Sequence, residues 1–140
     1  MSIALLQLSG WLLPERFQHV HDILIALGSL PGAWKLLAVY SVVVLAPLTE
    51  EIFFRGLVQS MLRRYVQNAW PAILLTSAMF ALMHMQNPQD VLSLFAFGVA
   101  LGYNYERCGR LYVPILMHGI FNAVSITIWL AASGQFPVWR

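Results

Sequence analysis

The chain carries unusually little charge. Only 10% of its 140 residues are Asp, Glu, Lys or Arg, whereas soluble domains average about 25%. A soluble domain of this size could not cover its surface with so few charges. The basic residues are scattered and give a net charge of only +2, so they form no positive patch of the kind that binds nucleic acid. These shortages argue against a soluble enzyme and against a nucleic-acid partner.

Cysteine is also scarce. Cys108 is the single cysteine and lies in a polar turn, which excludes a disulfide framework and a zinc site built from thiolates. The N-terminus lacks the basic segment that precedes the apolar run of a signal peptide, so we expect no cleaved signal.

Hydrophobic residues, by contrast, make up 59% of the chain. Proline, glycine and polar turns divide them into four apolar helical segments, at about residues 34–65, 70–84, 89–106 and 111–132. Residues 1–32 are mixed, and their apolar runs are too short to span a bilayer. We therefore predict an all-α, polytopic transmembrane helix bundle with about four core membrane helices. Residues 1–32 would form an N-terminal amphipathic segment at the interface, and residues 33–140 the membrane-embedded core.

Loop charges indicate an orientation. One side of the predicted bundle holds four arginines in short turns, and the other holds three basic residues in longer segments: Arg63, Arg64, Arg107 and Arg110 against Arg16, Lys35 and Arg140. The positive-inside rule places the four arginines in the cytoplasm. We expect an integral protein of the plasma membrane (the inner membrane if bacterial), with its catalytic side cytoplasmic.

The third predicted helix contains Gly98-x-x-x-Gly102. This spacing is a close-packing signature of membrane helices, although glycine is common there in any case. If the chain forms a homo-oligomer, this motif is the candidate seam.

Few strongly polar residues lie at membrane depth, namely Glu50, Glu51, Arg55, His84, His118 and Asn122. A charge at the bilayer centre costs about 3 kcal/mol even on insertion scales, so an intramembrane ionisable residue indicates function by default. The alternative is a polar network that only holds helices together.

Spacing suggests roles for the acidic residues. Glu51 and Arg55 are four residues apart on one helix face and can pair. Glu50 lies about 100° around the helix and need not share Arg55. A buried carboxylate without a close cation suits a general base near neutral pH, so Glu50 is the predicted base. Glu51 stays an alternative base, because helix geometry does not say which face meets the cavity.

Pro47 lies three residues before Glu50. It removes the helix donor of the Val43 carbonyl and predicts a kink that widens the space around Glu50, unless it is an ordinary membrane proline. Glu50 lies about 20 Å from the arginine end of its helix, and His84 about 21 Å along the returning helix. His118 lies only about 10 Å in, and Asn122 about 16 Å, so the fourth helix must tilt to bring them to the same level.

These residues, in this order and spacing, resemble the CPBP (ABI) family of intramembrane proteases, which includes CAAX proteases and bacteriocin-processing enzymes. The resemblance covers residues 34–132 and rests on three motifs, namely Glu50-Glu51-Ile52-Phe53-Phe54-Arg55, Phe80-Ala81-Leu82-Met83-His84 and His118-Gly119-Ile120-Phe121-Asn122. It implies an intramembrane endopeptidase whose substrate is a membrane-associated peptide or protein, such as a prenylated CAAX protein or a leader peptide.

The resemblance also implies residue roles. Glu50 would activate a water that His84 positions, and His118 and Asn122 would stabilise the oxyanion. The predicted catalytic residues are Glu50, Glu51, His84, His118 and Asn122, and the predicted supporting residues are Arg55 and Phe80. We expect no cofactor. Zinc held by His84, His118 and Glu50 is the alternative, disfavoured because the chain lacks a His-Glu-x-x-His helix.

Two other classes of function compete with a protease. A non-catalytic membrane partner, such as a bacteriocin self-immunity factor, could use the same buried polar groups to shape a binding surface. A proton-relay subunit would also bury Glu and His, but the absence of an internal repeat makes it less favoured.

Overall fold

The structure is a computed structural model and describes residues 31–84 and 90–132. Contacts divide the chain into two compact units, one formed by residues 39–123 and the other by residues 1–38 with 124–140. Every residue of the predicted site lies in the first unit. The predicted amphipathic segment falls almost entirely outside the described residues, as does residue 89, where the third helix is predicted to begin.

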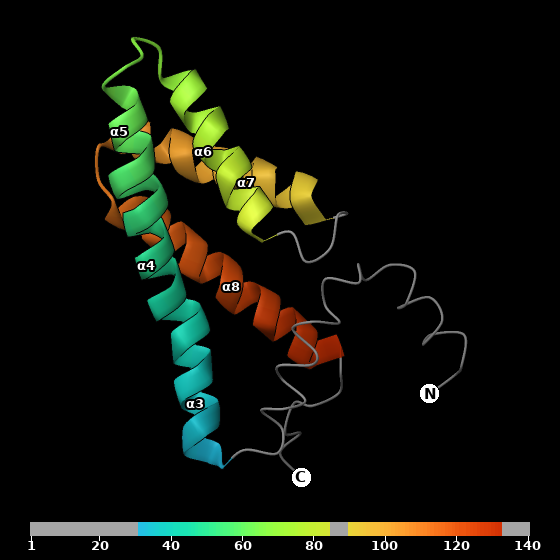
Figure 1. Cartoon of the computed structure of the whole chain (residues 1–140). Helices are drawn as coiled ribbons and strands as arrows, with labels where there is room; N and C mark the ends of the chain where they lie inside the picture. The colour runs from blue at the N-terminus through green and yellow to red at the C-terminus, as the bar shows by residue number, and fades with distance from the viewer. Residues whose placement is uncertain (1–30, 85–89, 133–140) are drawn as a thin grey trace, which may run out of the picture. The chain divides into compact units, whose positions relative to one another are not determined.

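The first helical stretch runs from Gly32 to Arg63 and is long and apolar enough to cross a membrane. It alternates between two kinds of helix: α3 (Gly32–Tyr40), the π-helix η1 (Ser41–Leu45), α4 (Ala46–Glu51), the π-helix η2 (Ile52–Gln59) and α5 (Ser60–Arg63). A π-helix bonds each N–H to the carbonyl five residues back, and such segments are frequent at functional sites. The acidic pair, Glu50 and Glu51, therefore lies on the short α-helix α4 between two π-helices (Figure 1).

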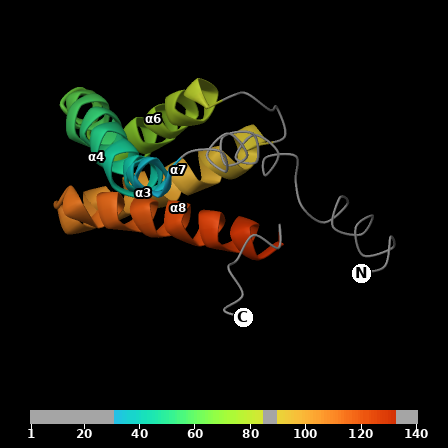
Figure 2. The same cartoon turned by 90° about the horizontal axis from the view of Figure 1, so that it is seen from below.

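Three further helices follow, α6 (Ala69–Met83), α7 (Asp90–Cys108) and α8 (Tyr112–Ala132). The Asn68 side chain caps α6 by accepting a hydrogen bond from the Trp70 N–H. Gly109, with φ of 62°, ends α7 in the left-handed conformation that glycine tolerates. Helices α6 and α7 pack side by side (Figures 1 and 2). No strand occurs in residues 31–84 and 90–132, so the all-α prediction is confirmed.

Polar side chains are buried and apolar side chains are exposed, which is the reverse of the pattern in a soluble protein. On α6, Thr76 and Ser77 are buried while Leu74, Leu75 and Leu82 are exposed. The same holds across the described residues, where the buried groups include an ion pair and the exposed ones include most of the large apolar side chains. Such an apolar surface is costly in water but matches a lipid environment.

A ladder of polar contacts joins the first helical stretch to α7. Three side chains spaced four residues apart meet partners with the same spacing: Arg55 Nη2 donates to the Gly98 carbonyl (2.9 Å), Gln59 Nε2 to the Gly102 carbonyl (3.1 Å) and Arg63 Nε to Glu106 (3.0 Å). Both helices thus present one stripe to each other. The ladder fixes α7 against the helix that carries the acidic pair.

The predicted close-packing role of the two glycines is correct, but its assignment to an oligomer seam is wrong. A Cβ on Gly98 would lie 3.1–3.3 Å from Ser77 on α6, and one on Gly102 would lie 2.7 Å from Gln59 Oε1. Both glycines face neighbouring helices of the same chain. The motif is therefore used inside the bundle, and it leaves oligomeric state an open prediction.

Replacing Gly98 with alanine is expected to destabilise the fold. The added Cβ would meet the Ser77 backbone Cα at 3.2 Å, and overpacking costs about 1–3 kcal/mol, which outweighs the roughly 1 kcal/mol that alanine gains in a helix. Thermal unfolding in detergent measures the effect. Gly56→Ala is the matched control, because its Cβ meets Leu111 at an ordinary 3.5 Å. A Gly98 variant as stable as the Gly56 variant would contradict the packing argument.

Candidate active site

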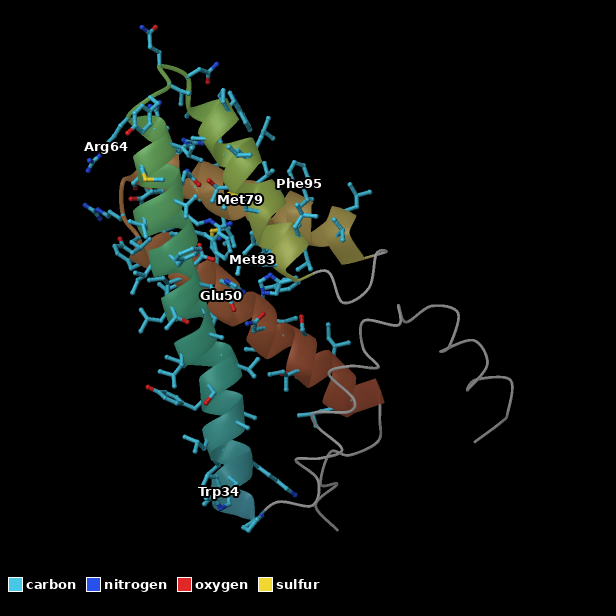
Figure 3. The ribbon with its side chains drawn as sticks, in the orientation of Figure 1. Trp34, Glu50, Arg64, Met79, Met83 and Phe95 are labelled. Carbon is cyan, nitrogen blue, oxygen red and sulfur yellow. The ribbon has the colours of Figure 1, made fainter. Side chains whose placement is uncertain are left out.

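Three helices bring the predicted residues together. Glu50 and Glu51 lie on α4, His84 follows the end of α6, and His118 lies on α8. In Figure 3, Glu50 lies close to Met83, the last residue of α6. The ionisable groups of the three motifs therefore meet within one unit.

Glu51 forms the buried centre of the site. Its Oε1 accepts hydrogen bonds from Arg55 Nη1 at 2.8 Å and from His118 Nδ1 at 2.9 Å. Both members of the ion pair are fully buried, with 0% of either side chain exposed. The Glu51–Arg55 pair predicted from the four-residue spacing is confirmed. In addition, Glu51 holds the imidazole of His118, which spacing did not predict.

Aromatic rings enclose the cation and the histidines. The guanidinium of Arg55 lies 5.1 Å from the centre of the Phe80 ring, within cation–π range. The same ring contacts His84, with centroids 4.5 Å apart, and meets His118 edge-on at 5.7 Å. Phe97 also packs edge-on against His118, with ring centroids 5.4 Å apart. Phe80 thus contacts Arg55 and both histidines, and its supporting role stays a prediction.

Glu50 differs from Glu51 in what its carboxylate contacts. Its Oε2 lies 3.6 Å from His84 Nε2 and 3.8 Å from His118 Nε2. Both distances are longer than a hydrogen bond allows, and this buried oxygen has no hydrogen-bond partner among the described residues. The side chain as a whole is 28% exposed. Glu50 therefore combines access with an unsatisfied oxygen that faces two imidazoles.

The partners of the two histidines determine where their protons lie. His84 Nδ1 is 2.8 Å from the Phe80 carbonyl, which can only accept. His118 Nδ1 faces the Glu51 carboxylate, which is paired with a cation and also accepts. Both rings therefore carry a proton on Nδ1. When neutral, each presents a lone pair on Nε2 toward Glu50.

With both histidines neutral, three hydrogen-bond acceptors face one another, namely Glu50 Oε2, His84 Nε2 and His118 Nε2. Such an arrangement requires a donor or a cation between them. A water molecule suits this arrangement, because it donates two protons and bridges polar groups that are too far apart for direct contact. A metal ion also suits the donor set, since ligating histidines usually bond their second nitrogen to a carboxylate or a carbonyl. Ligands of a tetrahedral zinc lie about 3.3 Å apart. In the described part of the chain, no three His, Cys, Asp or Glu side chains have that arrangement, so His84 and His118 would have to move slightly closer to Glu50.

Asn122 makes a contact that the resemblance did not imply. Its Nδ2 donates to the backbone carbonyl of Val42 at 2.9 Å. An amide nitrogen carries two N–H groups, and this bond uses one of them. The structure thus places Asn122 at the junction between α8 and η1.

Sequence reasoning missed several groups around the site. The Gly98 carbonyl, which holds Arg55, and the Val42 carbonyl, which holds Asn122, are backbone atoms and leave no signal in residue type. Phe97 is one aromatic residue among many. The matching four-residue spacings of Arg55 and Gln59 and of Gly98 and Gly102 were a usable signal for the ladder.

Comparisons with known proteins identify the family to which the chain belongs. The family model for type II CAAX prenyl endopeptidase Rce1-like proteins matches residues 32–124. An uncharacterised 24.3 kDa protein of Escherichia coli is 35% identical over 86 residues, which cover 59% of this chain and 40% of that relative. No solved structure matches the chain. The matched range contains all three motifs, and the chain belongs to the Rce1-like family of type II CAAX prenyl endopeptidases, which are membrane proteins.

Proposed function

We propose that the chain is an intramembrane endopeptidase that hydrolyses a peptide bond with a water activated by Glu50. One observation carries the proposal, namely the unsatisfied Glu50 oxygen that faces the Nε2 atoms of His84 and His118 at 3.6 and 3.8 Å. A base, groups that hold water and a buried charged support are what hydrolysis requires.

The chemistry begins with proton transfer from water to the Glu50 carboxylate. The resulting hydroxide attacks the carbonyl carbon of the scissile bond and forms a tetrahedral oxyanion. The second hydrogen stays on the hydroxide oxygen and donates a hydrogen bond to His84 Nε2, which orients the attacking lone pair. The proton held by Glu50 passes to the leaving nitrogen as the C–N bond breaks, giving a carboxylic acid and an amine.

His118 stabilises the negative charge of the tetrahedral oxyanion. Its ring lies between Glu51 at Nδ1 and Glu50 at Nε2. A protonated Nε2 donates a hydrogen bond, as the oxyanion requires. The Glu51–Arg55 pair holds the ring in place through the 2.9 Å bond.

Contacts favour Glu50 over Glu51 as the base. Glu51 Oε1 already accepts two charge-assisted hydrogen bonds, and its side chain is inaccessible. A base must reach the proton that it removes. Glu50 is partly exposed, and its Oε2 has no hydrogen-bond partner within residues 31–84 and 90–132.

A zinc-dependent version of the same reaction is the second candidate. The proton positions support it, because both histidines direct an Nε2 lone pair toward Glu50, and these three residues would hold the ion. A bound zinc would lower the pKa of its water and polarise the substrate carbonyl. We favour the metal-free version because the chain has no His-Glu-x-x-His helix.

The substrate proposed is a membrane-associated peptide or protein, and the family description suggests a prenylated one. We further propose that the catalytic side faces the cytoplasm, on the basis of the arginine-rich turns. The chain covers 40% of the relative it matches, so activity is to be tested on the chain itself.

The direct test is proteolysis by the purified chain in liposomes. A panel of prenylated and plain membrane peptides is offered, each with and without a strong zinc chelator. We expect cleavage that persists under the chelator, because Glu50 alone activates the water. A zinc protease assayed in the same liposomes verifies that the chelator works.

Two results would contradict the proposal at different points. Cleavage that stops under chelator and returns with zinc would assign His84, His118 and Glu50 as metal ligands. No cleavage of any peptide would favour the non-catalytic partner function over the protease.

A further inference from the structure

Pro47 leaves a gap in the hydrogen bonding of the helix that carries Glu50. In η1 the Ala46 N–H donates to the Ser41 carbonyl, five residues back. In the same register the next donor belongs to residue 47 and would reach the Val42 carbonyl. Proline has no N–H. The Ala46 N–H, which would serve Val42 in an α-helix, is already bonded to Ser41.

Asn122 fills this gap from another helix. Its Nδ2 donates to the Val42 carbonyl at 2.9 Å, across 80 residues of sequence. In lipid, a backbone carbonyl without a donor is costly, because water cannot replace the missing bond. The side chain therefore supplies the hydrogen bond that Pro47 cannot.

Gly119 allows the two helices to approach this closely. A Cβ at this position would lie 2.8 Å from the Val43 carbonyl, the next one along η1. Because glycine has no Cβ, the backbone of α8 can lie directly on the proline break. Two consecutive carbonyls of η1 thus face α8, one bonded to Asn122 and the other against Gly119.

This junction lies close in sequence to Glu50 and His118, whose separation matters for the proposed reaction. Pro47 precedes Glu50 by three residues, and Asn122 follows His118 by four. We propose that Asn122 is a positioning residue, which fastens α8 to the proline break and so sets the 3.8 Å separation of Glu50 Oε2 and His118 Nε2. Its effect on catalysis rests on the proposed function. The contact between Asn122 and the Val42 carbonyl does not depend on that function.

The inference differs from a direct role in oxyanion stabilisation. A group that donates to the substrate acts regardless of residue 47. A group that satisfies the Val42 carbonyl becomes dispensable once residue 47 regains an N–H. The identity of residue 47 therefore distinguishes a positioning role from a direct one.

The test combines Asn122→Ala with Pro47→Ala. We expect Asn122→Ala to lower kcat about 100-fold, the loss typical of a displacement of about 1 Å, with little change in KM. In the double variant, the N–H of residue 47 can donate to Val42, so at least about tenfold of the loss should return. An unchanged kcat deficit in the double variant would overturn the positioning role.

Thermal unfolding in detergent provides a readout that does not need activity. Asn122→Ala should lower the midpoint in the wild-type background and much less in the Pro47→Ala background. An equal drop in both backgrounds would overturn the contact as the replacement for the missing N–H. If the wild-type chain cleaves nothing, the proposed function fails while this measurement still decides the inference.

Asn104→Ala is the matched control. Its amide also donates to a backbone carbonyl, that of Ala100, at 2.8 Å. That carbonyl lies inside α7, where the helix supplies its own donor. The loss caused by Asn104→Ala should therefore be the same with proline or alanine at position 47, and a dependence on residue 47 would contradict the specific link between Pro47 and Asn122.

Discussion

Replacing Glu50 with glutamine is expected to abolish proteolysis while leaving the chain folded. Glutamine keeps the size of the side chain but cannot take a proton from water at neutral pH. Loss of a general base lowers kcat by about 10²–10⁴-fold. The fold should survive, because Glu50 is 28% exposed and its Oε2 makes no hydrogen bond with the described residues. The rate of peptide cleavage and the thermal midpoint are measured together.

Glu106→Gln is the control for the general loss of a carboxylate. Glu106 bonds Gln59 and Arg63 at the other end of the polar ladder, so its replacement should leave cleavage within a few-fold. A non-catalytic partner would keep its function in the Glu50→Gln variant, since shape and hydrogen-bonding capacity persist. Full proteolysis by the Glu50 variant would leave Glu51 as the alternative base.

Local spacing predicted the contacts that lie within one helix. Glu51 and Arg55 are four residues apart, and helix geometry makes such side chains neighbours whatever surrounds them. The same reasoning put Glu50 on a different face. Arg55 bonds Glu51 while Glu50 faces His84, although both carboxylates approach His118. Interactions set by the helical repeat could therefore be predicted from sequence.

Contacts between helices were predictable only in part. Counting residues from the arginine turns put His118 about two turns away from the level of Glu50. In the structure its Nε2 is 3.8 Å from Glu50, and α8 runs obliquely to α4 (Figure 1). Crossing angles depend on which ridges and grooves meet, and residue counting cannot supply them. The Gly98 motif shows the same limit, because its spacing predicts close packing but not the partner.

Backbone acceptors were the least predictable part of the site. Pro47 indicated a broken hydrogen bond, and the sequence suggested a kink. The structure has π-helices on both sides of α4, and Asn122 bonds the Val42 carbonyl near Pro47. Every residue has the same backbone carbonyl, so no pattern of residue types identifies which one a distant side chain will use.

The second large effect is expected at Arg55. Arg55→Met removes the guanidinium. Among the described residues, this leaves the fully buried Glu51 carboxylate with His118 as its only partner. Breaking a buried ion pair on one side costs about 3–5 kcal/mol. The thermal midpoint in detergent should fall sharply, and cleavage should be lost with the fold. Arg63→Met is the matched control, because the Arg63–Glu106 pair is 31% and 21% exposed, and such pairs contribute about 1 kcal/mol or less.

Replacing both members of the pair separates stability from catalysis. In Glu51→Met with Arg55→Met no unpaired charge remains, and apolar replacement of a buried pair is often neutral or stabilising. The double variant should therefore regain much of the stability that Arg55→Met loses. Cleavage should stay lost, because His118 Nδ1 no longer has the carboxylate that orients it. A double variant that is stable and active would mean that the pair serves the fold alone, whereas one that is stable and inactive identifies Glu51 as the group that holds His118 for the reaction.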